Sequence, residues 1–107
     1  MSVAARRHHD VRDDVIAVSN HIADDSIDAA ARFPDAVEAT IAGLRAFPGK
    51  GSLKHFNDPR LSGIRSYAVD GFPNHLILYG RDADGGITVL MVTQGSRQQE
   101  FILRRRV

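Results

Sequence analysis

The chain has 107 residues, of which 43% are hydrophobic and 25% charged, and its formal net charge is +1. This size and composition are typical of one globular domain spanning residues 1–107, and the small net charge excludes a strong global field directed at nucleic acid or a membrane. The absence of cysteine excludes disulfides and thiolate metal sites, and no apolar run reaches the roughly 20 residues of a membrane helix, so we expect a cytoplasmic protein.

Two amphipathic helices are predicted in the first half of the chain. Apolar residues recur on one helical face from Val11 onward, and this first helix is expected to end near residues 24–25. Ser26 is the expected N-cap of the second helix, which Pro34 should interrupt and residues 48–51 should end. Because the connection is short, the two helices should form an antiparallel helical hairpin.

The second half of the chain reads as an antiparallel meander. Strands are predicted at residues 64–69, 71–79 and 87–97, and the Asp- and Gly-rich segment 82–86 favours a β-hairpin between the last two. The continuous apolar stretch at residues 89–92 indicates that the last strand is central or covered on both sides.

These elements define an α+β fold. Residues 3–9 add a short edge strand, which gives the order (β)ααβββ and a helical hairpin packed on a three- to four-stranded antiparallel sheet. Residues 98–107 form a basic tail. A flexible end is one interpretation of the tail; docking on the domain, extending the sheet and binding an acidic partner are the alternatives.

Few motifs indicate chemistry. Adjacent residues of a strand point to opposite faces, so His8 and His9 are not expected to share a metal ion, and no cofactor motif is present. Cleavage of RNA without a metal requires a proton-transfer pair and cations around the phosphate. The predicted sheet offers cations and a phenol, although a solvated strand face explains them equally well: Lys54, His55, Arg65, Tyr79, Arg81 and Arg97.

Several stretches carry a family resemblance when they are taken in order and at their spacing: residues 11–25, 30–33, 44–51, 63–65, 69–79 (VDGFPNHLILY) and 87–98 (ITVLMVTQGSRQ). The chain resembles the RelE/ParE superfamily, the toxins of bacterial type II toxin–antitoxin modules. The GFPNHLI stretch favours the ParE branch. The resemblance implies a plasmid-stabilisation toxin that arrests growth and forms a hetero-oligomer with its cognate antitoxin.

The chain departs from the family pattern at two positions. Gln94 stands where the family has His, Gln98 stands where it has Asp, and Arg97 matches the family's Arg. Glutamine cannot transfer a proton near neutral pH. By resemblance, the ParE branch inhibits DNA gyrase and the RelE branch cleaves mRNA on the ribosome, so Gln94 favours the ParE activity.

Three interpretations follow. In the first, a non-enzymatic toxin contacts gyrase and its antitoxin through Arg65, Tyr79, Gln94 and Arg97. In the second, a metal-independent endoribonuclease holds mRNA phosphates with Arg65, Arg81 and Arg97, while Tyr79 or His55 transfers the proton. In the third, the chain is an inactive member that kept the fold.

Overall fold

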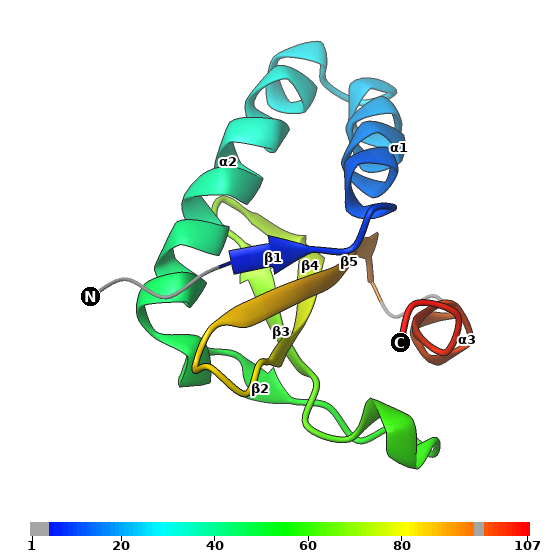
Figure 1. The fold of residues 1–107 in the computed structure, drawn as a ribbon. Coiled ribbons are helices and arrows are strands. Elements are labelled where there is room, and N and C mark those ends of the chain that lie inside the picture. The colour runs from blue at the N-terminus through cyan, green and yellow to red at the C-terminus, as the bar shows by residue number, and fades with distance from the viewer. Residues whose placement is uncertain (1–4, 96–97) are drawn as a thin grey trace.

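The computed structural model describes residues 5–95 and 98–107, which form two layers of helices around a sheet (Figure 1). The elements are β1 (Ala5–Arg7), α1 (Val11–Ala23), α2 (Ile27–Ala46), the 3₁₀ helix η1 (Pro48–Lys50), β2 (Ser52–Leu53), the 3₁₀ helix η2 (Pro59–Leu61), β3 (Arg65–Val69), β4 (Phe72–Arg81), β5 (Ile87–Gln94) and α3 (Gln99–Leu103). The predicted α+β class and its helical hairpin are confirmed.

The hairpin follows its sequence signals closely. The Ser26 hydroxyl accepts a hydrogen bond of 3.1 Å from the Ala29 amide and so caps α2 as expected. Pro34 does not interrupt α2, which runs unbroken from Ile27 to Ala46. Proline at this position removes one backbone donor, but its ring is exposed, and the buried neighbours Phe33 and Val37 hold the helix against the sheet.

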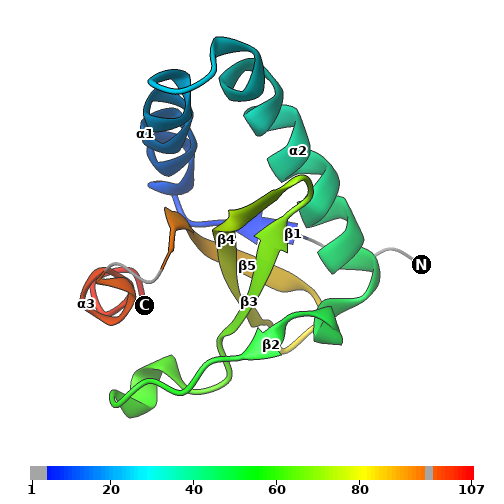
Figure 2. The same cartoon turned by 180° about the vertical axis from the view of Figure 1, so that it is seen from behind.

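The sheet has five strands in the order β1-β5-β4-β3-β2. Figure 2 shows the same fold from behind. β1 lies parallel to β5 and every other pair is antiparallel. The prediction of three to four antiparallel strands was therefore incomplete. It missed β2, whose two residues are too few to show an alternation, and it could not assign the direction of β1.

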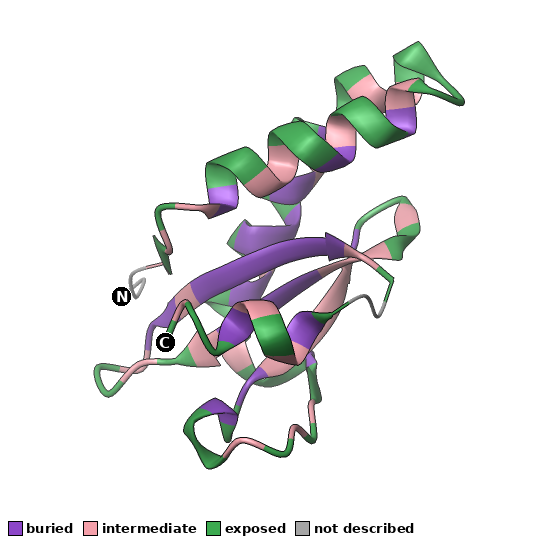
Figure 3. Ribbon diagram, turned by 90° about the vertical axis from the view of Figure 1, so that its right-hand side faces the viewer, coloured by how far each residue is buried: buried purple, intermediate pink, exposed green. Residues whose placement is uncertain are grey.

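β5 occupies the centre of the molecule. It lies between β1 and β4, and both of its faces are covered, as the buried colouring in Figure 3 shows. One face packs under α1 and α2, and the other packs against α3 and the segment before β3. A β-bulge opposite Leu78 and Tyr79 breaks the alternation, so the neighbours Leu90 and Met91 both join the second cluster. The predicted central position of the last strand is confirmed.

The basic tail is not an extended flexible end. Residues Gln99–Leu103 form α3, and Leu103 is completely buried in the second cluster. Among the alternatives left open by the sequence, docking on the domain is the one observed. The apolar residues before the three arginines provide the physical reason, because they cover a sheet face that would otherwise contact water.

Candidate partner-binding surfaces

Two of the residues singled out in the sequence meet at one end of the sheet. Arg65 on β3 and Arg81 at the end of β4 line a hollow of about 500 Å³, together with Leu53 and the turn after β4. Nη1 of Arg65 donates hydrogen bonds to the carbonyl oxygens of Gly51 (2.7 Å) and Gly49 (3.4 Å). The guanidinium is thus held in place while remaining partly exposed.

Tyr79 lies beneath this end and does not reach the surface. Its side chain is completely buried, its hydroxyl donates to the Pro48 carbonyl oxygen (2.7 Å), and it accepts from the Gly51 amide (2.9 Å). Assigning Tyr79 as a partner contact or a proton-transfer group was wrong. The period-2 pattern of a strand does not say which face is covered, and here Tyr79 points under α2 into the larger core.

Gln94 lies at the opposite end of β5. Its Nε2 is 3.0 Å from Nε2 of His21 on α1, and it is paired across the sheet with His75 on β4. Gln94 is therefore not part of the Arg65–Arg81 hollow. Arg97 falls outside the described residues, so the structure does not place it.

His55 and Lys54 lie in the segment between β2 and β3. His55 is exposed and is not among the residues that line the Arg65–Arg81 hollow. The Lys54 ammonium lies 5.7 Å from the centre of the Phe56 ring, within the range of a cation–π contact. Neither side chain completes a catalytic arrangement with the two arginines.

The structure also has a groove that the sequence did not indicate. It measures about 940 Å³ and lies where the α1–α2 connection overhangs the β3–β4 turn and the end of β5. We call it the acidic groove, because its lining includes the carboxylates of Asp25, Asp35 and Asp70. Asp70 reads in the sequence as a turn residue only, and no local pattern predicts that it lines the same groove as Asp35.

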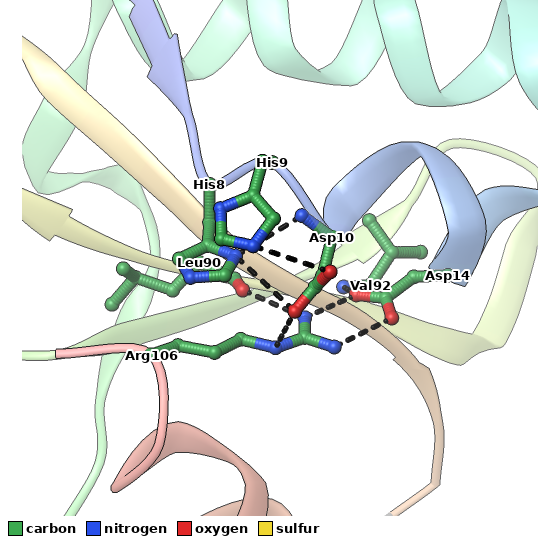
Figure 4. Close-up of polar contacts among 7 residues, drawn as sticks. All are labelled: His8, His9, Asp10, Asp14, Leu90, Val92 and Arg106. Atoms are coloured by element: carbon green, nitrogen blue, oxygen red, sulfur yellow. Dashed lines mark hydrogen bonds and ion pairs between the residues drawn. The ribbon is translucent and has the colours of Figure 1, made fainter.

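A histidine cluster follows β1 (Figure 4). Donor atoms of His8, His9 and Asp10 lie within 4.8 Å of one another, and the two imidazole rings stack with their centres 4.2 Å apart. The expectation that the two rings point to opposite faces was wrong, because β1 ends at Arg7 and the chain turns there.

The contacts of this cluster are structural. Nδ1 of His8 accepts a hydrogen bond of 3.1 Å from the Asp10 amide, and Nε of Arg106 lies 3.9 Å from an Asp10 carboxylate oxygen. Burial, with the neighbouring His9, lowers the pKa of His8. The His8 lone pair is occupied and a guanidinium is adjacent, so we assign no metal to this cluster.

The fold and the comparisons define the class of the protein. A helical hairpin on a mainly antiparallel five-stranded sheet is the arrangement of RelE/ParE-like toxins. The family model described as "ParE toxin of type II toxin-antitoxin system, parDE" matches residues 6–99, so the chain belongs to the ParE toxin family. Membership implies a cognate antitoxin as its partner.

A search of curated proteins found no match. No helix among residues 5–95 and 98–107 is both long enough and apolar enough to cross a membrane.

Proposed function

We propose that this toxin inhibits DNA gyrase by protein–protein contact and is neutralised by its antitoxin without itself breaking a covalent bond. The observation that carries the proposal is the burial of Tyr79, whose hydroxyl is engaged by Pro48 and Gly51. Near Arg65 and Arg81, mRNA cleavage would need a group that exchanges a proton with the substrate. Tyr79 cannot reach a substrate from its buried position, and Gln94 is not ionisable and lies at the other end of the sheet.

The neighbouring carboxylate is also engaged. Asp82 lines the hollow, but it accepts hydrogen bonds from Thr88 (2.8 and 3.0 Å) and pairs with Arg6 at 2.7 Å. This leaves a surface with two guanidinium groups and an apolar rim at Leu53, which suits acidic side chains of a protein partner. Because Arg65 is already held by backbone carbonyls, little side-chain freedom would be lost on binding.

The test measures two activities of the same purified protein. We expect it to inhibit supercoiling by purified gyrase and to leave mRNA intact in a translating extract. The Arg65→Ala and Arg81→Ala variants should weaken inhibition roughly tenfold, as is typical of interface arginines. Arg12→Ala, which removes an exposed arginine from α1, is the matched control and should inhibit as well as the unchanged protein.

Each outcome is informative. Circular dichroism of each variant separates a lost contact from lost folding. Cleaved mRNA with normal supercoiling would replace the proposal with the endoribonuclease interpretation. Normal supercoiling with intact mRNA and unimpaired growth would identify an inactive member of the family.

A further inference from the structure

Unpaired carboxylates gather at one end of the molecule. Six acidic side chains of the described residues form ion pairs with arginine or histidine: Asp10, Asp14, Glu38, Asp58, Asp82 and Asp84. Within the described residues, Asp25, Asp35 and Asp70 form no ion pair, and all three line the acidic groove. Arg32 is the one arginine in that lining, so carboxylates outnumber guanidinium groups there although the whole chain carries a net charge of +1.

The groove also has an apolar floor. Ile22 on α1, Ala29 and Ala36 on α2, and Phe72 at the start of β4 line it between the carboxylates. Ile22 is buried, whereas the other three are only partly covered by the protein. The Phe72 ring is fixed by an edge-to-face contact with Phe33 at 5.0 Å, so the floor is already formed in the free protein.

We propose that this groove binds a basic, amphipathic segment of the antitoxin. The apolar side chains of that segment would lie on the Ala29–Phe72 floor, and its Lys or Arg side chains would reach Asp35 on one wall and Asp70 on the other. Charge complementarity of this kind selects the partner and speeds its association. Only the identity of the partner, the antitoxin, rests on the proposed function. The groove chemistry by itself specifies a cationic segment.

The position of the groove separates it from the Arg65–Arg81 hollow. The acidic groove lies at the β3–β4 turn, while the hollow lies at the other end of the same strands, beside the β4–β5 turn. An antitoxin in the groove therefore leaves the two arginines uncovered unless its chain also extends along the sheet. A partner that carries basic residues for one end and acidic residues for the other fits both surfaces in only one orientation.

The experiment uses two synthetic helical peptides that share one Leu and Ala pattern. One peptide carries Lys at every polar position and the other carries Glu. Titration into the isotopically labelled full-length protein, followed by NMR, should move the amide resonances of Asp35, Asp70 and Phe72 with the Lys peptide. The Glu peptide should leave these resonances in place.

Charge reversal in the groove supplies the second readout. Asp35→Lys and Asp70→Lys should each weaken binding of the Lys peptide by about three- to tenfold at low salt. Asp13→Lys is the matched control, because Asp13 is exposed and forms no ion pair with a described residue but lies in the first turn of α1, outside the groove lining. It should bind the Lys peptide like the unchanged protein.

Equal binding of the two peptides, resonance changes centred elsewhere, or full binding by Asp35→Lys would overturn the proposal. A cognate antitoxin whose toxin-binding segment lacks Lys and Arg would overturn it as well. The supercoiling assay is independent of this titration. A failed titration with intact gyrase inhibition removes only the groove assignment, whereas Lys-peptide binding without gyrase inhibition removes only the proposed target.

Discussion

Arg106, three residues beyond α3, forms a bidentate ion pair with Asp14 in the first turn of α1. Its Nη1 and Nη2 donate to the two carboxylate oxygens at 2.6 and 2.9 Å, and the side chains are 11% and 15% exposed. The contact joins residues 92 positions apart in the chain. It therefore ties the C-terminal segment to the helical hairpin across the edge of the sheet (Figure 4).

The pair takes the place of a neighbouring strand. β1 follows β5 only as far as Val89, and beyond that point β5 has backbone groups that face away from β4. The Leu90 carbonyl oxygen accepts from Arg106 Nη1 (3.0 Å), and the Val92 amide donates to the Asp14 carboxylate (3.0 Å). The two side chains thus satisfy an edge that would otherwise be open to pairing with another chain.

Removing the guanidinium should be costly. We expect Arg106→Ala to lower the free energy of unfolding by about 2–4 kcal/mol, because it leaves the half-buried Asp14 carboxylate and the Leu90 carbonyl without this partner. Urea denaturation monitored by circular dichroism measures the loss. The neighbouring exposed Arg105, whose guanidinium stacks on Phe101, is the control, and Arg105→Ala should cost under about 1 kcal/mol. Equal losses would show that the Arg106 contact does not form in solution.

Tyr79→Phe should affect stability and not activity. The change removes the hydroxyl that bridges Pro48 and Gly51 inside the protein, at an expected cost of about 1–3 kcal/mol. Since the ring is buried, gyrase inhibition by the folded variant should match that of the unchanged protein. Unaltered stability combined with lost inhibition would restore Tyr79 as a direct contact.

Gly51 is required for its lack of a side chain. A Cβ at this position would lie 2.6 Å from the Tyr79 hydroxyl and 2.9 Å from the Ser66 carbonyl oxygen. We expect Gly51→Ala to destabilise the protein by about 1–3 kcal/mol in thermal or urea unfolding. Gly49→Ala, where a Cβ would meet open space, should be neutral or stabilise by up to about 1 kcal/mol.

A double variant sharpens this test. Tyr79→Phe removes the atom nearest to the new Cβ, so Gly51→Ala should cost less in the Tyr79→Phe background than alone. If the losses in free energy of unfolding of the two single variants add exactly in the double variant, the strain in Gly51→Ala does not come from the Tyr79 hydroxyl.

Acidification should destabilise the protein through His75. Burial, with a smaller contribution from the nearby His21, lowers the pKa of His75, and its buried Nδ1 has no hydrogen-bond partner among the described residues. The unfolded chain then binds the proton more readily than the folded one. The His75 contribution to the free energy of unfolding should therefore be constant above about pH 7. It should fall as the pH drops below the pKa of histidine in the unfolded chain, about 6.5.

Urea unfolding between roughly pH 8 and 5.5 measures this dependence. His75→Gln should flatten it, leaving the contribution of His8, whose pKa is lowered in the same direction. Exposed Arg12→Ala, which leaves every histidine in place, is the control and should keep the full dependence. An unchanged slope in His75→Gln would mean that His75 does not titrate differently in the two states.

Local patterns in the sequence specified much of the fold. The apolar spacing of α1 and α2, the Ser26 cap and the turn residues before β4 and β5 act between neighbours in the chain, so the sequence could be read for them directly. The motifs likewise identified the family, because their order and spacing are properties of the chain itself.

Only the tertiary structure decided which face of each strand is covered and which distant residues meet. It buried Tyr79, placed Arg65 and Gln94 at opposite ends of the sheet, and paired Arg106 with Asp14. It also placed Asp35 on α2 and Asp70 after β3 in the lining of one groove. The physical reason is that a helix or strand pattern sets the direction of a side chain relative to its own element, whereas burial and charge pairing depend on which element packs against it.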